Sequence, residues 1–429
     1  MKVLYLIVLE HIYGDGIFET QVKNLLKEIK KKYKDEISIT LLAILPIVHI
    51  NRKGIHFIAY CHSSDLKDIK DEFNYYDINI TIFYVPLPRW SFYLKIYFFP
   101  IFLFTAIPIL AAFIKFGKYK VVHCRSYLSA FLCVLLKKMG FQIAILFDTR
   151  APVPEQGVIS GHYGHKSWMF RIWKKIEAVC LKNSNITVAI TEKFAEELRK
   201  IEPFNRKEVI HNTVNIKEFF HTEEGRQNLR KELGISDNIV LVYNGSLGTW
   251  NDPELMVEVF QNLLKSTGNM LLMIFSPYDR GKLLDIFKQR GIPETNFKIH
   301  SLNPTQVPLY LSAGDYGLWP SKRFQGNNSI EKIHATVTGI KTFEYLAAGL
   351  PIIANENMAG VKSLVEKYRV GITFNPNNPE RMLEDFMELH KRYLDTKQAC
   401  REVAANLANV EIQAKKYYLI YKDIISAKY

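Results

Sequence analysis

The chain has 429 residues, of which 48% are hydrophobic and 23% charged; this composition belongs to a folded protein and excludes an intrinsically disordered one. A chain of this length is too long for one hydrophobic core, so two domains are expected. The five cysteines are scattered and form no CxxC pair, which gives no support for a zinc site or a disulfide framework and fits a reducing compartment.

The net charge of +13 is concentrated in the first half of the sequence. Residues 1–220 carry 31 Lys and Arg against 20 Asp and Glu, whereas residues 221–429 carry 25 against 23. We therefore expect an acidic partner for the first half: anionic lipid, nucleic acid or a phosphorylated substrate. No nucleic-acid recognition motif or basic-aromatic module is present, so a nucleic-acid partner is not expected.

Strand-like and helix-like patterns alternate through the first half, which predicts a parallel sheet covered by helices on both faces. The first apolar run is short and lacks a small-residue cleavage site, so it is expected to be a buried strand and not a signal peptide. The strand patterns lie at 2–10, 37–45, 119–127, 142–150 and 185–190, and the helix patterns at 11–33 and 191–200.

Polar side chains stand at the ends of two of these strands. His123 and Arg125 end one strand, and Asp148 and Arg150 end the next. In parallel sheets the residues just past the strand ends line the ligand crevice, so these four are candidates for a site. A structural reading stays open: His123 as a hydrogen-bonded core histidine, and Asp148 with Arg150 as a structural ion pair.

An uncharged run of nineteen residues, 96–114, is long enough to span a membrane. Pro100 and Pro108 interrupt it, lysines flank it, and aromatic residues stand before it. Three interpretations are open: a buried helix pair, a true span, or shallow insertion into the cytoplasmic leaflet with basic residues on the headgroups. Shallow insertion is the one we favour.

A second alternating series begins near residue 237, after a polar stretch at 216–236 that is expected to hold the domain boundary. Its strand patterns lie at 238–244, 269–275, 315–319, 350–355 and 370–374, and helix patterns start at 339, 360 and 378. The last helix pattern, 411–427, is expected to return to the first domain.

Glu344 lies in the helix pattern that opens at Gly339. Most glutamates on helices are solvated, and Lys341 is three residues away and near enough to pair with it. The position of Glu344, one turn into this helix, favours a role in binding a ligand instead. Free amides at a helix N-terminus suit phosphate, and a carboxylate one turn into the helix can accept two hydrogen bonds from a ribose diol.

The segment K-x-x-E-Y-L-A-x-G-x-P at 341–351 resembles the donor-sugar signature of glycosyltransferase family 4, retaining enzymes with the GT-B fold. Other segments resemble that family in the same order over nearly the whole chain. They lie at 13–26, 121–127, 147–155, 188–194, 209–220, 243–250 and 313–321. The resemblance implies two Rossmann-like domains facing across a cleft: an acceptor domain of residues 1–220 with helix 411–429, and a donor domain of residues 221–410.

The resemblance also implies roles for single residues. Glu344 would bind the donor ribose, with Lys341 and the amides near Gly339 at the diphosphate. The remaining donor-side residues would be Gly16, Gly245, Ser246 and Lys322. The residues expected near the acceptor or the transferred sugar are His123, Arg125 and Glu155.

Two features depart from the family pattern. Many members carry a second glutamate eight residues before the one matching Glu344, where this chain has Thr336. The cations often found after the first donor loop are also missing, which leaves Lys322, Arg323 and Lys341 to offset the leaving-group charge. Glu331 or His334 could replace the missing glutamate, although ordinary loop surface is the simpler interpretation of both.

These inferences predict a retaining transferase that moves a sugar from a nucleotide-diphosphate donor, UDP-linked, to an acceptor on polyprenyl diphosphate, as in bacterial surface-polysaccharide synthesis. No Asp-x-Asp occurs, so no metal or other cofactor is expected. The expected place is the cytoplasmic face of the cell membrane, held peripherally or monotopically by 90–120 and the basic first half. The alternatives are another GT-B reaction, such as UDP-sugar epimerisation, and a degenerate GT-B subunit that binds a partner enzyme.

Overall fold

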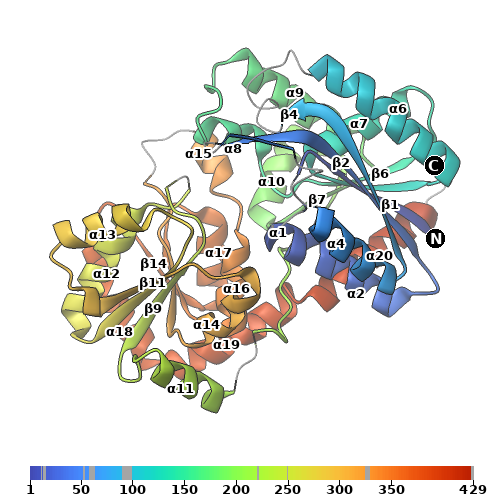
Figure 1. The fold of residues 1–429 in the computed structure, drawn as a ribbon. Coiled ribbons are helices and arrows are strands. Elements are labelled where there is room, and N and C mark those ends of the chain that lie inside the picture. Colours follow the sequence, from blue (N-terminus) through green and yellow to red (C-terminus); the bar gives the residue numbers. More distant parts are fainter. Residues whose placement is uncertain are drawn as a thin grey trace. The chain divides into compact units, whose positions relative to one another are not determined.

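The computed structural model describes residues 1–10, 12, 16–51, 54–57, 63–88, 99–219, 222–248, 250–323 and 329–426. The chain divides into two compact units: unit 1 comprises residues 1–211 and 410–429, and unit 2 comprises residues 212–409. Each unit is a sheet with helices on both faces (Figure 1). The prediction of two Rossmann-like α/β domains is confirmed.

Unit 1 is built on an eight-stranded sheet. Its strands are β1 (Lys2–Val8), β2 (Ser38–Asn51), β3 (Gly54–Phe57), β4 (Ile78–Pro88), β5 (Val121–Arg125), β6 (Ala144–Asp148), β7 (Ile186–Ala189) and β8 (Arg206–Val209). The order is β3-β2-β1-β5-β6-β7-β8, with β4 also paired to β2. All pairs are parallel except β2 with β3. The run expected to be a strand and not a signal peptide is β1, buried from Val3 to Val8.

Helices cover both faces of this sheet. They are α1 (Gly16–Phe18), which continues through a π-helical turn (Glu19–Lys23) into α2 (Asn24–Tyr33), then α4 (Ser63–Tyr75), α6 (Phe99–Gly117), α7 (Ser126–Lys138), α8 (Val153–Ile159), α9 (Trp168–Asn183), α10 (Glu192–Ile201) and α20 (Val410–Ser426). Figure 1 shows α6, α7 and α9 on one face and α2, α4 and α20 on the other. The predicted threonine cap is present, because the Thr191 hydroxyl accepts from the Phe194 N–H and begins α10.

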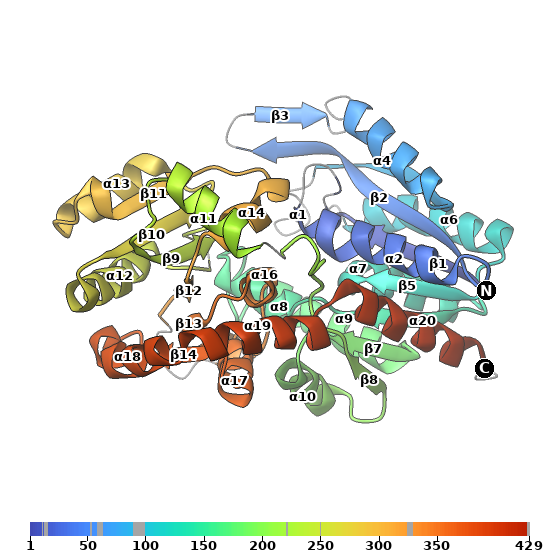
Figure 2. The same ribbon diagram turned by 90° about the horizontal axis from the view of Figure 1, so that it is seen from below.

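The last helix, α20, belongs to unit 1, as expected. It runs beside α2 (Figure 2) and buries an apolar stripe in the core under β1 and β5. Tyr417 and Tyr421 on this stripe are fully buried and point their hydroxyls at the ends of β5 and β6. The end of the chain therefore helps to build the site region of unit 1.

Unit 2 contains a six-stranded, fully parallel sheet. Its strands are β9 (Ile239–Asn244), β10 (Met270–Phe275), β11 (Phe297–His300), β12 (Tyr316–Trp319), β13 (Ile352–Asn355) and β14 (Gly371–Phe374). The order is β11-β10-β9-β12-β13-β14. The chain reverses its direction of travel across the sheet between β9 and β12, and in such sheets ligands bind at the carboxyl ends of the strands at this switch point.

Two apolar clusters sandwich the sheet of unit 2. The helices are α11 (Glu223–Glu232), α12 (Pro253–Thr267), α13 (Arg280–Gln289), α14 (Val307–Ser312), α15 (Ser329–His334), α16 (Ile340–Ala348), α17 (Ala359–Tyr368), α18 (Leu383–Lys391) and α19 (Tyr393–Leu407). The clusters place α12, α13 and α18 on one face and α14, α16, α17 and α19 on the other.

The stretch 216–236 holds a helix of unit 2, α11, and the two units divide at His211 and Asn212. The stretch is polar because one face of α11 carries arginines. Arg226 and Arg230 both pair with Asp315, which lies just before β12.

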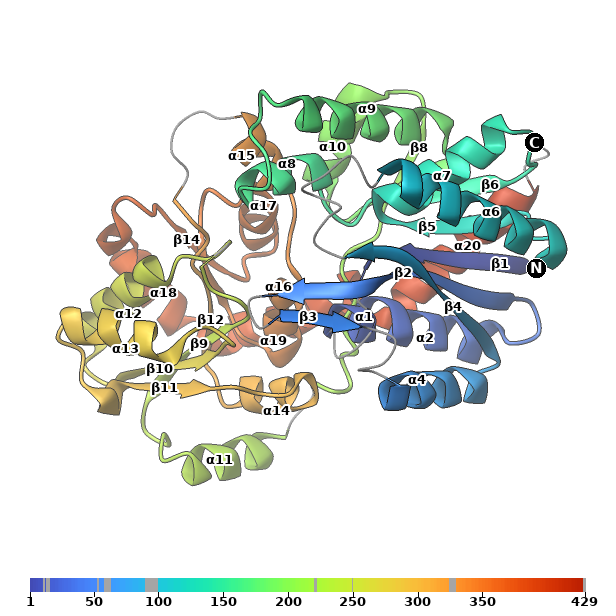
Figure 3. The ribbon, with the colours of Figure 1, turned by 45° about the horizontal axis from the view of Figure 1, so that its top comes forward.

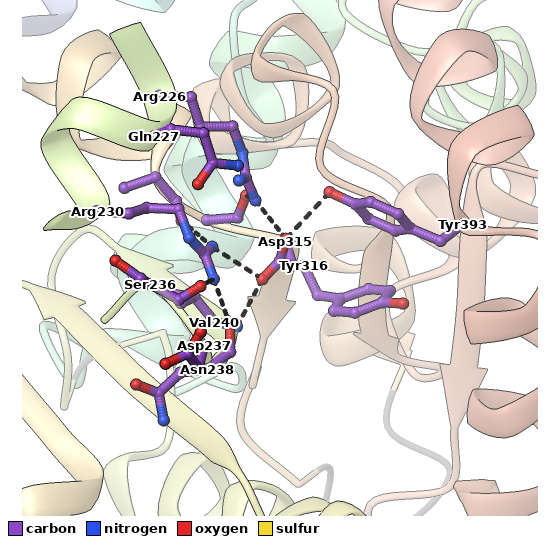
Figure 4. A network of polar contacts seen from close by, with 12 residues as sticks. Arg226, Gln227, Arg230, Ser236, Asp237, Asn238, Val240, Asp315, Tyr316 and Tyr393 are labelled. Atoms are coloured by element: carbon purple, nitrogen blue, oxygen red, sulfur yellow. Dashed lines mark hydrogen bonds and ion pairs between the residues drawn. The ribbon is translucent and has the colours of Figure 1, made fainter. Parts of the chain in front are cut away.

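Figure 4 shows the network that these side chains form. Arg230 lies 3.1 Å from Asp315, and the Tyr393 hydroxyl donates to the same carboxylate over 3.2 Å. The Val240 N–H donates to Asp315 over 2.7 Å. One carboxylate thus joins α11, β9, β12 and α19. It lies at the amino ends of β9 and β12, whereas the switch-point residues lie at their carboxyl ends.

From residue 99 onward the apolar run forms one helix, α6, which continues through Pro108, so the helix pair, one of the three open interpretations, is not what the described residues form. Figure 3 shows α6 alongside α7. Only a narrow stripe of Phe102, Ala106, Leu110 and Ile114 is buried, whereas Phe104 is 83% and Phe116 82% exposed. The interfacial aromatics expected at 90–98 lie outside the described residues.

By length and composition alone α6 could cross a membrane: an 18-residue stretch of it has a mean hydropathy of 2.1, and 22% of that stretch is buried in the structure.

Candidate functional site

The side chain of Glu344 lies beside the end of β9. The Asn244 side-chain amide donates to its Oε2 over 2.8 Å, and Asn244 is the last residue of β9. The Tyr345 hydroxyl accepts from the Asn244 N–H over 2.8 Å and donates to the Leu318 carbonyl over 3.3 Å. Two consecutive residues of α16 therefore bind the ends of the two strands that flank the switch point.

Lys341 lies one turn earlier on α16. Its Nζ donates to the Tyr243 hydroxyl over 3.3 Å and lies 4.5 Å from the ring centroids of both Tyr243 and Trp319. Neither Lys341 nor Glu344 has a salt-bridge partner in the described residues. The surface pair that their spacing allows is therefore not formed, because Glu344 is hydrogen-bonded to Asn244 whereas Lys341 lies against Tyr243 and Trp319.

Burial moves both pKa values toward neutrality. It lowers the pKa of Lys341 to about 7, although the Glu344 carboxylate acts in the opposite sense. It raises the pKa of Glu344 to about 7, against the hydrogen bond from Asn244 and the charge of Lys341. Two neighbouring ionisable groups with shifted pKa values at the carboxyl ends of strands are typical of a functional site.

Two glycines keep backbone close to Lys341. Gly245 has φ +125°, a conformation that strains other residues, and a Cβ there would lie 3.7 Å from Lys341 Nζ. Gly339 is the N-cap of α16, and a Cβ on it would lie 2.6 Å from the Trp319 ring. The hydroxyls of Thr338 and Thr342, next to this helix start, are buried without a hydrogen-bond partner. This is the arrangement that an anion at a helix N-terminus needs.

Ser246 and Lys322 are the remaining predicted donor-side residues of unit 2. The Ser246 carbonyl accepts from the Tyr243 hydroxyl over 2.6 Å and from the Asn251 amide over 3.0 Å. Lys322 is exposed after β12. Arg323 pairs with Asp252 and Glu258, so its charge is already balanced and it is a poor candidate for offsetting a leaving group.

In unit 1, His123 is fully buried. Its Nδ1 lies 2.6 Å from the Tyr421 hydroxyl and its Nε2 3.3 Å from Asp148 Oδ2, and its ring packs on Tyr5. Burial lowers the pKa of His123, although the Asp148 carboxylate opposes the shift. This geometry is that of a hydrogen-bonded core histidine, and substrate contact by His123 stays a prediction.

Asp148 and Arg150 form the ion pair that the structural reading of the sequence left open, with 3.5 Å between Oδ2 and Nη1. Arg125 binds Glu10 over 2.7 Å, and its Nη1 is buried without a partner. Gly16 begins α1, and its carbonyl accepts from the Thr20 hydroxyl over 2.7 Å. The loop residues 13–15 before it lie outside the described residues.

Glu155 belongs to a different cluster. It is 1% exposed in the first turn of α8, and Lys174 lies between it, at 3.0 Å, and Glu177. Burial, reinforced by the negative charge of Glu177, raises the pKa of Glu155 to about 6. The structure therefore groups His123 with Arg125 at the end of β5, and places Glu155 with the α9 residues.

Sequence reasoning missed the side chains that hold the predicted ones in place. Asn244, Tyr243 and Trp319 do so in unit 2, and Tyr417 and Tyr421 in unit 1. The position of Asn244 at a strand end was the available signal for that residue. Nothing in the sequence links the tyrosines of α20 to His123, which lies about three hundred residues earlier.

Comparison with known sequences gives two matches in tandem. Residues 47–218 match the family described as "Glycosyltransferase Family 4", and residues 225–406 match "Glycosyl transferases group 1". The chain is a GT-B glycosyltransferase.

One curated relative of the transferase is alpha-monoglucosyldiacylglycerol synthase of Acholeplasma laidlawii. The two are 24% identical over 258 residues, which is 58% of this chain and 61% of the relative, less than two thirds of its length. Among solved structures, HepE of Anabaena in complex with UDP and glucose covers 99% of the transferase and is itself covered 100%, with a TM-score of 0.65 and 13% identity. The match to sucrose-phosphate synthase of Thermosynechococcus elongatus covers 100% of the transferase and 100% of the synthase chain, with a TM-score of 0.69 and 14% identity.

The expected family-4 resemblance is confirmed at the level of the GT-B glycosyltransferases and their fold. Within the described residues, no group of three or more His, Cys, Asp and Glu side chains is placed to hold a metal ion. Metal independence, the retaining outcome and the site roles stay predictions.

Proposed function

We propose that the transferase moves a sugar, with retention, from a UDP-linked donor to a membrane-associated lipid acceptor. The observation that carries the donor side is the cluster at the switch point of unit 2, where Glu344 and Lys341 lie beside glycine-bearing backbone. Glu344 accepts hydrogen bonds from the ribose hydroxyls. Lys341 and the N-terminus of α16 stabilise the diphosphate, without a bound metal ion or another cofactor.

The reaction needs no enzymic nucleophile in the front-face route. The acceptor hydroxyl oxygen forms a bond to C1 of the sugar as the bond from C1 to the diphosphate oxygen breaks on the same face. The acceptor proton passes to the departing diphosphate, so atoms and charge balance. The protein supplies the positive charge that stabilises the leaving group, which is the role assigned to Lys341.

The acceptor side rests on unit 1. The exposed aromatic side chains of α6 are Phe104 and Phe116, and the exposed Lys115, Lys118 and Lys120 lie close in sequence to the second of them. An apolar helix face next to cations suits shallow insertion into an anionic leaflet, at the cytoplasmic face of the cell membrane. An acceptor on polyprenyl diphosphate would lie in that membrane, and His123, Arg125 and Glu155 are the residues we assign to its side of the reaction.

A second acceptor class, diacylglycerol, is favoured by the name of the Acholeplasma relative. The two classes are separated by incubating the full-length transferase with UDP-sugars and vesicles that contain either polyprenyl-diphosphate-linked sugar or diacylglycerol. Mass detection of the product identifies the acceptor. If neither vesicle yields a glycosylated lipid and the UDP-sugar is instead converted to its epimer, the transfer reaction is overturned.

The donor role is tested by Glu344→Gln. Glutamine still accepts from Asn244 but loses the negative charge that strengthens hydrogen bonds to the ribose, so UDP-sugar affinity should fall about ten- to hundredfold. Glu366→Gln on α17 is the control, because Glu366 is an exposed glutamate whose ion-pair distance is 3.8 Å. Calorimetry that finds equal affinity in the variant and the wild type would remove Glu344 from the donor site.

A further inference from the structure

The short helix α15 carries two polar side chains with buried, unpartnered atoms. His334 is 9% exposed, and its Nδ1 is buried without a hydrogen-bond partner. Glu331, three residues earlier and so on the same side of the helix, has Oε2 buried without a partner. Buried polar atoms are nearly always hydrogen-bonded in folded proteins, so two unpartnered atoms on one helix face are candidates to bind a polar ligand.

The His334 ring has a defined orientation. It stacks on Trp250 with 4.6 Å between ring centroids and 24° between planes. Burial lowers the pKa of His334 to about 4, so the ring is neutral in ordinary buffers. A neutral imidazole donates from one nitrogen and accepts at the other. With the Glu331 carboxylate it offers both hydrogen-bond senses, as the hydroxyl groups of a sugar require.

The loop that holds Trp250 connects α15 to the donor cluster. The Trp250 carbonyl accepts from the Lys322 N–H over 3.1 Å. The next residue, Asn251, binds the Ser246 carbonyl, which also accepts from Tyr243, the residue that Lys341 contacts. His334 thus lies on the same loop network as Lys341, within unit 2.

Thr336 is occupied in closing the turn between α15 and α16. It is 6% exposed, and its hydroxyl donates to the Ile333 carbonyl over 2.6 Å. The neighbouring Ala335 carbonyl accepts from the Gly360 N–H over 2.9 Å. The position where a glutamate was expected therefore has its only side-chain proton committed to the backbone.

We propose that Glu331 and His334 bind hydroxyl groups of the transferred sugar and thereby determine which nucleotide sugar the transferase accepts. This inference rests on the proposed function. UDP alone lacks the sugar, so UDP binding does not use these residues.

The test measures affinities of the full-length transferase by calorimetry, for UDP and for UDP-glucose, UDP-galactose and UDP-N-acetylglucosamine. His334→Phe keeps an aromatic ring for Trp250 and removes both nitrogens, and Glu331→Gln keeps the shape and removes the charge. Each variant should lose about tenfold in affinity for the preferred UDP-sugar, whereas its affinity for UDP should stay within about twofold. Lys332→Gln, an exposed neighbour on the same helix, is the control and should change neither affinity.

The outcomes separate the two proposals. Equal loss of UDP and UDP-sugar affinity, or no loss in either variant, overturns the role of α15 and leaves the donor site in place. If the wild type binds neither UDP nor any UDP-sugar, the proposed function fails as well. If His334→Phe is unfolded by circular dichroism, the isosteric Glu331→Gln decides the result.

Discussion

At the scale of single residues, Lys341 and Glu344 are the pair on which donor binding depends. The sequence predicts both residues and the glycines near them, because one motif contains α16 and its N-cap. It cannot predict that Asn244 and Tyr243 are their partners. Those contacts join α16 to a strand about a hundred residues earlier, and they exist only once the sheet has formed.

The two pKa values near 7 predict a bell-shaped pH dependence for donor binding. Lys341 loses its charge as pH rises through about 7, and Glu344 gains a proton as pH falls through about 7, so affinity for UDP-glucose should be greatest near neutrality. Far from the maximum, each arm should change by about tenfold per pH unit.

Calorimetry from about pH 6 to pH 9 checks this profile in variants of each residue. Lys341→Met should remove the fall at high pH, and Glu344→Gln the fall at low pH. Lys341→Arg is the matched control because it keeps a positive charge. In this variant the fall in affinity should move to higher pH. A wild-type profile that is flat over this range would contradict the assignment of either group.

At the scale of elements, α6 could be predicted from its apolar run, but its exposure could not. The hydropathy of a sequence does not distinguish a buried helix from a helix with a solvent-exposed apolar face. Only the packing in the structure shows that α6 buries a stripe of four residues. The two prolines left open whether the run forms one helix or a pair of helices. The structure has one helix: Pro100 lies in its first turn, where a proline is tolerated, and the helix continues past Pro108.

Replacing exposed side chains of α6 should release the transferase from membranes. The change Ile101→Ser with Phe104→Ser and Phe116→Ser removes exposed apolar area without touching the buried stripe, so folding should persist. Flotation with vesicles rich in anionic lipid should show loss of most binding. Leu394→Ser, another exposed apolar residue but in unit 2, should bind as the wild type does. Undiminished flotation of the triple variant would place the membrane contact elsewhere.

At the scale of the whole molecule, the chain closes unit 1 with its last helix. Deleting residues 410–429 removes the two tyrosines that bind His123 and Asp148, together with the buried stripe of α20. Hydrogen exchange should then show faster exchange at the amides of β5 and β6, with those of β9 and β12 unchanged, because α20 belongs to the core of unit 1.

A milder change, Tyr421→Phe, should give a smaller effect confined to β5 and its neighbours, because only the hydrogen bond to His123 is lost. Faster exchange spread equally over both units, or none after the deletion, would contradict the division into two cores.

The sequence by itself determined the fold class, the two α/β units and the position of the donor motif, whereas the return of the last helix to unit 1 is seen only in the structure. These are local: strand and helix periodicity, glycines at turns, and a motif carried on one helix with its N-cap. Only the tertiary structure decided which side chains surround that motif, that His123 is buried beneath the strand ends, and that Glu331 and His334 are left without partners. The burial of a side chain and its hydrogen-bond partners depend on contacts between segments far apart in the chain, and the pattern within one segment does not predict them.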